Sequence, residues 1–221
     1  MAAYLDYYSL EEINTPIICY FEGNIACGKS TIMEQYKKYS NIDMLIEPLN
    51  IWQNFKKANL LELRYKNKKD YEFKFQMLAN ISRLEQINEF YHNKSVKFLE
   101  RSLYSSFEVF VEFSKKTTGM DEIEYELLKY MYEVSIKGAL GSITKPDLII
   151  YVQTEPETCF SRMVNRKRNA EVTVPFDIIQ GLHESHENWL QNLDNSSKIP
   201  CPVIVLDGNF CLLYTSDAAD D

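Results

Sequence analysis

Residues 23 to 31 read GNIACGKST and follow the apolar run from residue 16 to residue 21, with Glu22 between them. The two glycines, Lys29 and Ser30 fit the phosphate-loop pattern GxxxxGK[ST], in the required position between a strand and a helix. Glycines let the backbone wrap closely around phosphate oxygens, so that N–H groups and the start of the helix face the anion. The stretch therefore predicts a nucleotide-binding loop.

Two side chains of this loop have specific predicted tasks. Lys29 would reach the β- and γ-phosphates of ATP, and the Ser30 hydroxyl would bind Mg²⁺. The residues predicted to contact ATP are Gly23, Asn24, Ile25, Ala26, Cys27, Gly28, Lys29, Ser30 and Thr31. The alternative is a Gly-containing turn without a ligand. Because kinases, GTPases and motor ATPases share this loop, the reaction has to be identified from other residues.

The rest of the chain alternates between short apolar runs and longer stretches of helical period. The runs are 17–21, 44–46, 96–99, 148–152 and 203–206. The helical stretches are 29–39, 51–91, 104–114, 122–142, 157–166 and 176–193. Continuous apolar runs are typical of strands that are buried on both faces, so the pattern predicts an α/β protein with a parallel sheet. The charged residues 66–70 predict a solvated turn between helices.

Length and composition favour a single domain over residues 1–210, since no linker or repeat divides the 221 residues. The last residues, CLLYTSDAADD at 211–221, resemble a cloning or read-through artefact or a disordered tail and are excluded from the fold prediction. A net charge of −8 argues against binding to a nucleic acid polymer. Scattered cysteines without CxxC pairs, no transit-like N-terminus and no long apolar run predict a cytoplasmic protein that binds no membrane.

Charged residues follow two of the predicted strands. Glu47 ends the second run, and Glu100 and Arg101 end the third. Because parallel strands present their carboxyl ends at the same edge of a sheet, these groups should meet beside the phosphate loop. They suit phosphoryl transfer to a hydroxyl: one carboxylate accepts the proton, the arginine holds reacting oxygens and the other carboxylate completes the metal shell. Surface ion pairs at strand ends are the structural alternative.

Three arginines lie in the stretch SRMVNRKRNAE. Arg162 and Arg166 share a helix face, and Arg168 follows where the helix should end. Like charges at this spacing repel unless an anion lies between them, so we predict a lid that closes over ATP. The alternative is a solvated basic helix end, which the helix dipole favours.

Several separated motifs together resemble the deoxyribonucleoside kinases, over residues 17–206. They are EGNIACGKST, EPLNIW, NLLELRY, FQM, ERSLYSS, PDLIIYV, RKRNAE and LHESHENWL, in the order of that family. The resemblance implies a P-loop kinase fold of three layers: a five-stranded parallel sheet in the order 2-3-1-4-5, flanked by helices, with an arginine-rich lid. It also implies ATP and Mg²⁺ as cofactors, a small-molecule deoxynucleoside as substrate, and a homodimer formed through residues 104–114 and 122–142.

The resemblance also implies roles for catalytic residues. Glu47 is similar to the general base for the 5′-hydroxyl, with Arg101 contacting the same region. Lys29 belongs to the phosphate loop. Glu100 is similar to the carboxylate that, together with the serine at the position of Ser30, binds Mg²⁺ in that family.

The resemblance further implies a pocket for the deoxynucleoside. Tyr65 and Glu171 look like the pair that binds the sugar 3′-hydroxyl. Trp52 and Phe110 resemble the aromatic walls around the base, for which core packing is the alternative. Gln76 resembles the glutamine that pairs with the base edge. Since a side-chain amide offers both a donor and an acceptor, rotation of Gln76 would serve several bases.

Three more pocket positions bear on the choice of base. Ala79 and Arg83 share a helix face with Gln76 and are similar to the deoxycytidine and deoxyguanosine kinases. In those enzymes an aspartate partners the arginine, but Ser106 stands at that position here. Arg83 must then find another acceptor, turn to solvent or contact the base, because an unpaired buried guanidinium is costly. We expect a preference for deoxycytidine and purine deoxynucleosides over thymidine.

Two other functions share parts of this pattern. A nucleoside monophosphate kinase of the thymidylate type has the same loop and lid, but it needs cationic residues for a monophosphate where Glu47 stands. A non-catalytic nucleotide-binding subunit would not need Lys29, Glu47 and Arg101 together.

Overall fold

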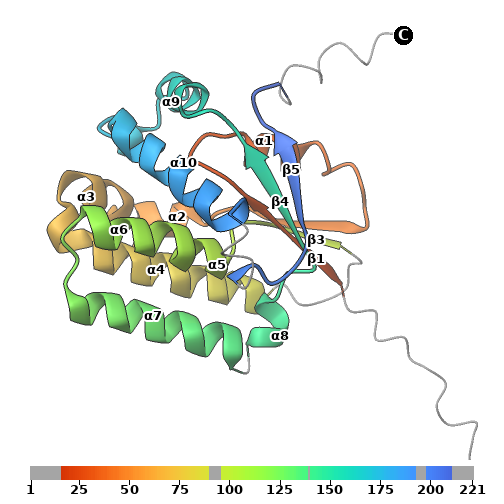
Figure 1. Ribbon diagram of the computed structural model, residues 1–221, viewed down its shortest axis with the longest axis horizontal. Helices are drawn as coiled ribbons and strands as arrows, with labels where there is room; N and C mark the ends of the chain where they lie inside the picture. The colour runs from red at the N-terminus through yellow and green to blue at the C-terminus, as the bar shows by residue number, and fades with distance from the viewer. Residues whose placement is uncertain (1–15, 90–95, 139, 193–197, 211–221) are drawn as a thin grey trace, which may run out of the picture.

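A computed structural model describes residues 16–89, 96–138, 140–192 and 198–210 of the chain. Five parallel strands form one sheet in the order β2-β3-β1-β4-β5 (Figure 1). The strands are β1 (Ile17–Glu22), β2 (Ile42–Leu45), β3 (Val96–Glu100), β4 (Leu148–Gln153) and β5 (Val203–Asp207). Each strand overlaps one of the predicted apolar runs, so the predicted α/β class and strand order are confirmed.

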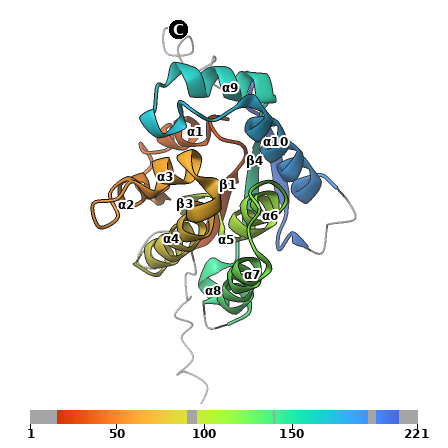
Figure 2. The ribbon, with the colours of Figure 1, turned by 90° about the vertical axis from the view of Figure 1, so that its left-hand side faces the viewer.

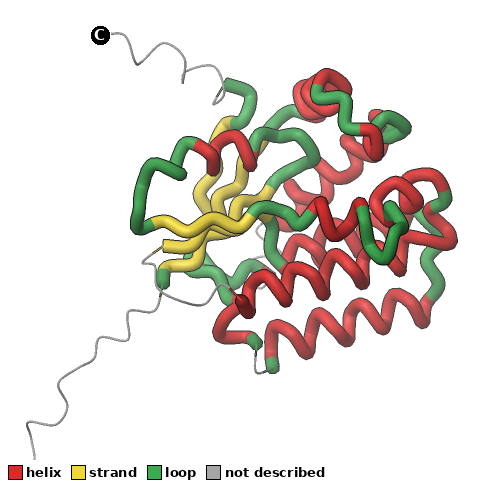
Figure 3. The backbone as a smooth tube through the Cα atoms, turned by 180° about the vertical axis from the view of Figure 1, so that it is seen from behind, coloured by secondary structure: helices red, strands yellow, loops and turns green. Residues whose placement is uncertain are grey.

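Helices flank both faces of the sheet. They are α1 (Lys29–Glu34), α2 (Leu49–Gln53), α3 (Leu60–Lys66), α4 (Lys68–Glu89), α5 (Leu103–Ser105), the π-helix η1 (Ser106–Val111), α6 (Glu112–Thr117), α7 (Glu122–Lys137), α8 (Gly141–Thr144), α9 (Pro156–Asn165), the 3₁₀-helix η2 (Asn169–Glu171) and α10 (Phe176–Leu190). Figure 2 shows α1 and α9 on one side of the strands and α4 to α8 on the other. Figure 3 shows the sheet between these helices from behind.

Alternate strand residues bury the two faces of the sheet, as the strand period requires. Cys19 and Phe21 of β1 pack with Met33 of α1 and Met163 of α9. On the other face, residues such as Tyr20 pack with α4, and β4 packs with η1 and α10 through a second group of apolar side chains. This sheet therefore holds the carboxyl ends of β1, β2 and β3 in fixed positions beside one another.

Two predicted helical stretches are divided in the structure, and one predicted turn is shorter. The stretch 51–91 is divided into α2, α3 and α4, because Asn59 caps α3 by accepting a hydrogen bond from the Glu62 N–H, and Asn67 ends it. The predicted charged turn at 66–70 is reduced to Asn67, and Lys68 already begins α4. The stretch 122–142 breaks at Gly138, where a Cβ atom would lie 2.4 Å from the Val134 carbonyl oxygen.

The stretch 104–114 contains six residues of π-helix. The extra residue per turn changes which side chains share a face, and no pattern in the sequence signals it. The other predicted helix, 29–39, ends at Glu34 and continues as turns. Residues 1–15 of the predicted domain and its tail 211–221 lie outside the described residues.

Candidate active site

The loop between β1 and α1 has the backbone that its glycines allow. Gly23 has a φ of 140° and Gly28 a φ of 112°, both in the region that favours glycine. A Cβ atom on Gly23 would lie 2.6 Å from the carbonyl oxygen of Val152. The buried Lys29 amine donates to the carbonyl oxygens of Gly23 at 3.2 Å and Asn24 at 2.9 Å. The loop is thus folded around this amine at the end of β1.

Ser30 and Glu100 are brought together as predicted. The Ser30 hydroxyl lies 3.0 and 2.9 Å from the two carboxylate oxygens of Glu100, and the Lys29 amine lies 3.9 Å from the same carboxylate. A hydroxyl and a carboxylate are the hard oxygen ligands that Mg²⁺ prefers when it also binds phosphates and water. The described residues contain no group of three or more His, Cys, Asp or Glu residues that would form a metal site of their own.

Glu47 follows β2, accepts a hydrogen bond from the Arg83 guanidinium and forms an ion pair with the Arg101 guanidinium. Arg83 Nη2 lies 2.6 Å from its Oε1 atom, and Arg101 Nε lies 2.9 Å from the same atom. Burial alone would raise the pKa of Glu47, but the positive charges of Arg101, Arg83 and Lys29 outweigh it and lower this pKa. Glu47 is therefore a carboxylate at neutral pH, although it is buried.

Arg101 is placed by an unusual backbone conformation. Its φ is 68°, in the left-handed region that a non-glycine residue seldom adopts, and its N–H donates to the Phe21 carbonyl oxygen at 3.0 Å. The next residue, Ser102, donates to the buried Glu22 carboxylate through both its N–H (2.8 Å) and its hydroxyl (2.6 Å). These bonds hold the turn after β3 against the end of β1 and aim Arg101 toward Glu47.

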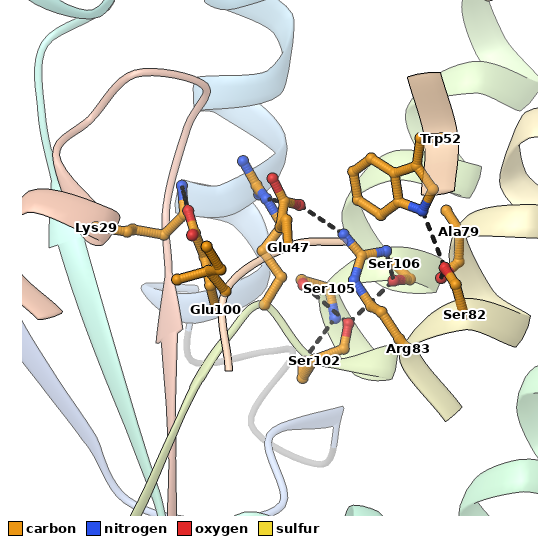
Figure 4. A network of polar contacts seen from close by, with 12 residues as sticks. Lys29, Glu47, Trp52, Ala79, Ser82, Arg83, Glu100, Ser102, Ser105 and Ser106 are labelled. Atoms are coloured by element: carbon orange, nitrogen blue, oxygen red, sulfur yellow. Dashed lines mark hydrogen bonds and ion pairs between the residues drawn. The ribbon is translucent and has the colours of Figure 1, made fainter. Parts of the chain in front are cut away.

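Arg83 finds its acceptor in Glu47 instead of the aspartate of its relatives. Figure 4 shows its guanidinium between Glu47 and Ser106, which accepts a hydrogen bond from Nη1 at 2.9 Å. The guanidinium also lies over the Trp52 ring, 5.0 Å from its centroid. Of the three alternatives for Arg83, the structure therefore shows pairing with another acceptor.

A second buried ion pair was not predicted from the sequence. Arg64 of α3 donates through Nε to Glu72 of α4 at 2.7 Å. The other carboxylate oxygen of Glu72 accepts from Ser114 at 2.6 Å and from Gln76 Nε2 at 2.8 Å. Burial would raise the pKa of Glu72, but Arg64 and these hydrogen bonds together lower it, so Glu72 is ionised. Rotation of the Gln76 amide, expected from the sequence, is opposed by this contact.

The aromatic residues predicted around the base lie on facing elements. Trp52 of α2 donates from its indole N–H to the Ser82 hydroxyl at 2.9 Å (Figure 4). Phe110 of η1 lies under the Arg101 guanidinium, 4.5 Å from the ring centroid. Both rings line one cavity and also belong to the apolar core, so the two interpretations of these aromatics are compatible.

The predicted lid arginines have carboxylate and carbonyl partners. Arg166 donates to Glu171 at 2.6 to 2.8 Å, and Arg168 donates to the same carboxylate at 2.9 Å. Arg162 instead donates to the carbonyl oxygens of Cys27 at 3.2 Å and Gly208 at 2.9 Å, behind the phosphate loop. Glu171 is thus engaged by arginines, and no hydrogen bond joins it to Tyr65 among the described residues.

One cavity of about 240 Å³ joins these groups. Of the predicted site residues, its walls contain Ile25, Ala26, Ser30, Glu47, Trp52, Tyr65, Gln76, Ala79, Arg83, Glu100, Arg101, Phe110, Arg166, Arg168 and Glu171. Its walls also contain Ile46, Leu49, Leu61, Arg64 and Phe75, which were not predicted. Ser106 lies behind Arg83 and does not line the cavity, while Lys29 and Arg162 lie outside it. The phosphate loop and this pocket therefore meet near Glu47.

A family model described as "Deoxynucleoside kinase" matches residues 18–221 of the chain. The chain belongs to the deoxynucleoside kinase family. This kinase is 31% identical to the mitochondrial thymidine kinase 2 of Macaca fascicularis, over 90% of the chain and 73% of that protein. It is 34% identical to a probable deoxycytidine kinase of fowlpox virus (strain NVSL), over 86% and 78%, and 30% identical to human deoxycytidine kinase, over 85% and 82%.

Membership of this family makes the chain an enzyme that phosphorylates deoxynucleosides with ATP. It removes the alternatives of a thymidylate-type kinase and of a non-catalytic subunit. No helix in the described part of the kinase is long and apolar enough to cross a membrane.

One signal in the sequence could have pointed to the two residues of the unpredicted ion pair of the kinase. Glu72 precedes Gln76 by four residues, which places both on one face of a helix. Arg64 directly precedes Tyr65, which the motif NLLELRY already assigned to the pocket. These positions could have marked Glu72 and Arg64 as candidate pocket residues, but they do not show that the two side chains meet.

Proposed function

We propose that this kinase transfers the γ-phosphoryl group of ATP to the 5′-hydroxyl of a deoxynucleoside held in the cavity, with Glu47 as the proton acceptor. The observation that carries the proposal is the place of Glu47. Its carboxylate lines the cavity between Arg83 and Arg101, at the ends of the strands that also present the phosphate loop and Glu100. A 5′-hydroxyl bound there would lie between the Glu47 carboxylate, which accepts its proton, and the phosphate-binding groups.

Glu47 would hold the hydroxyl in line for attack and take its proton. Its lowered pKa makes it a weak base, and this suits phosphoryl transfer, in which the hydroxyl proton leaves late, after bonding of the oxygen to phosphorus has made that proton acidic. Arg101, paired with the same carboxylate, would approach the transferring oxygens as negative charge builds on them.

ATP would be held by the loop from Gly23 to Thr31 and by the lid. Lys29 would donate to the β- and γ-phosphates after leaving its carbonyl partners. Mg²⁺ fits the Ser30 hydroxyl and the Glu100 carboxylate and would supply charge neutralisation between the phosphates. Arg166 and Arg168 would exchange Glu171 for phosphate oxygens.

The deoxynucleoside would lie deeper in the cavity. Trp52 and Phe110 would cover the two faces of the base, with Gln76, Ala79 and Arg83 at its edge. Tyr65 and Glu171 would bind the 3′-hydroxyl once the lid arginines turn to phosphate. We retain the preference for deoxycytidine and purine deoxynucleosides over thymidine as a proposal.

The quaternary state and the compartment are also proposals. The exposed face of α7 carries Ile123, Leu127, Tyr130 and Val134, with 51 to 74% of each residue exposed. Their i, i+4, i+7, i+11 spacing places them on one face of the helix as an apolar stripe. Helix α7 itself lies at the outside of the helical layer (Figures 1 and 2). A second copy of the chain would cover this stripe and form the homodimer. The free cysteines of the described residues fit the reducing cytoplasm.

The test of the reaction measures ATP consumption with deoxycytidine, with deoxycytidine monophosphate and without an acceptor. We expect turnover with the nucleoside alone. Glu47→Gln should lower kcat by about 100-fold or more while ATP binding, measured by calorimetry, is retained. Full turnover of Glu47→Gln would show that Glu47 is not the proton acceptor.

A further inference from the structure

The base end of the cavity is organised by a residue that does not line it. Glu72 is 2% exposed, and it lies behind Arg64 and Gln76, which both do line the cavity. Its two carboxylate oxygens accept hydrogen bonds from Arg64 Nε at 2.7 Å and from Gln76 Nε2 at 2.8 Å. Glu72 therefore fixes two groups of the cavity wall relative to each other.

The contact with Glu72 sets the orientation of the Gln76 amide. An ionised carboxylate only accepts hydrogen bonds, so the amide nitrogen must be the end of Gln76 that faces Glu72. The amide oxygen is then the end turned away from Glu72 and from Arg64. A rotated amide would place two oxygens against each other in a buried site, which costs the hydrogen bond and adds repulsion.

Arg64 has donors left over for a ligand. It uses Nε for Glu72, and its two Nη atoms have no hydrogen-bond partner among the described residues. They are not sealed in the interior either, since no Arg64 nitrogen is among the buried atoms without a partner. Its guanidinium carbon also lies over the Phe75 ring, 4.8 Å from the ring centroid. Arg64 thus offers the cavity a fixed set of N–H groups.

Because Arg64 and the Gln76 amide nitrogen both bind the Glu72 carboxylate, the amide nitrogen is the end of Gln76 on the Arg64 side, and we infer the order donor, donor, acceptor along the wall. The first is Arg64 Nη, the second the remaining N–H of Gln76 and the third the Gln76 oxygen. The edge of cytosine presents the complement: O2 accepts, N3 accepts and the 4-amino group donates. Adenine matches only the last two positions. Thymine and uracil carry an N3–H donor where the wall offers another donor, and guanine carries N1–H there.

We propose that Arg64 and Gln76, ordered by Glu72, read the edge of cytosine and make deoxycytidine the preferred substrate, with deoxyadenosine second. This inference rests on the proposed function, since it assumes that a deoxynucleoside occupies the cavity. Arg64 and Gln76 would touch the base, whereas Glu72 acts through them as a positioning residue.

The first test compares kcat/KM for deoxycytidine and deoxyuridine, which have similar shapes and differ at positions 3 and 4 of the base. The unmodified kinase should prefer deoxycytidine by at least about tenfold. Glu72→Gln replaces the carboxylate with a group that also donates, so Gln76 can rotate and present its oxygen beside Arg64. The ratio should then move toward deoxyuridine by about tenfold. An unchanged ratio in a folded Glu72→Gln protein would overturn the proposal.

Ser114→Ala is the matched control. It removes a 2.6 Å hydrogen bond to the same carboxylate but leaves Arg64 and the Gln76 amide as they are. Its thermal unfolding temperature should fall while the deoxycytidine-to-deoxyuridine ratio stays constant. If Glu72 had only a structural role, both variants would lower the unfolding temperature and neither would change the ratio.

A second test needs no variant and covers the case in which Glu72→Gln does not fold. In 3-deaza-2′-deoxycytidine a carbon replaces the N3 acceptor, and kcat/KM should fall by at least about tenfold with the unmodified kinase. Equal use of both nucleosides would contradict the proposal. If thymidine or deoxyguanosine is the best substrate, this inference fails and the proposed function stands. If none of the four deoxynucleosides is phosphorylated, the proposed function itself fails.

Discussion

Glu47 shares one oxygen atom between two arginines, and this has a consequence for the pH dependence of catalysis. Arg83 is one of the charges that lower the pKa of Glu47 against the effect of burial. Glu47 can accept a proton only as a carboxylate, so activity is present above the pKa of Glu47 and is lost as the pH falls through this pKa. Removing Arg83 should raise this pKa and move the acid limb of the pH profile to higher pH.

Arg83→Met tests this expectation through kcat/KM measured across acidic and neutral pH. Lys115→Met is the control, since Lys115 is a cation paired with Glu122 on the surface and its loss should leave the profile in place. An acid limb that stays at the same pH in Arg83→Met would show that the Arg83–Glu47 pair does not control the ionisation of the base.

The same pair changes how Ser106 is understood. In the sequence, a serine at this position seemed to leave Arg83 without a counter-charge. In the structure, Ser106 accepts one hydrogen bond from Arg83, and the charge is balanced by Glu47 from another element. Sequence position alone could not show this, because Glu47 and Arg83 are 36 residues apart and meet only when β2 and α4 are packed.

At the scale of elements, the junction of β1, the phosphate loop and α1 depends on Gly23. Gly23→Ala would place a Cβ atom 2.6 Å from the Val152 carbonyl oxygen at a φ of 140°. We expect the free energy of unfolding to fall by more than about 2 kcal/mol and ATP binding to be lost.

Gly119→Ala is the matched control, because Gly119 also has a positive φ, of 71°, but has no atom within 4 Å of an added Cβ. Gly119→Ala should lower the free energy of unfolding only by the backbone strain, about 1 kcal/mol, and should leave ATP binding intact. Chemical denaturation and calorimetry with ATP check both variants. Equal losses in the two would mean that backbone strain, and not the clash with β4, decides the stability of the loop.

The elements themselves were predicted with uneven success, for identifiable reasons. The central strands β1 and β4 are largely buried, so their apolar runs were visible in the sequence. The stretch 51–91 was predicted as one helix, but a turn with positive φ at Lys56 and Lys57 separates α2 from α3, and the caps at Asn59 and Asn67 bound α3. The grouping of Glu47, Glu100 and Arg101 could be predicted because parallel strands present their carboxyl ends at one edge of the sheet. The Arg64–Glu72 pair did not, because it depends on how α3 folds back on α4 after Asn67.

At the scale of the whole molecule, the apolar stripe of α7 predicts the oligomeric state. Leu127→Glu would place a charge at the centre of the stripe, and the dimer should dissociate to monomers at micromolar concentration. Lys129→Glu is the control, since Lys129 is a partner of Glu126 outside the stripe. Light scattering after size-exclusion chromatography measures the mass of both. A Leu127→Glu protein that keeps the dimer mass, or an unmodified chain that is monomeric, would contradict the prediction.

The salt bridge between α3 and α4 also limits how this enzyme could change its substrate during evolution. Arg64 lies next to Tyr65 in the chain, and Glu72 is bonded to Gln76, so one ion pair links α3, with the proposed sugar-binding residue, to α4, with the proposed base-reading residue. A mutation of either partner alone leaves a buried charge unpaired and disturbs both helices. New base preferences at this position should therefore arise through paired replacements, and homologues should carry either both charged residues or neither.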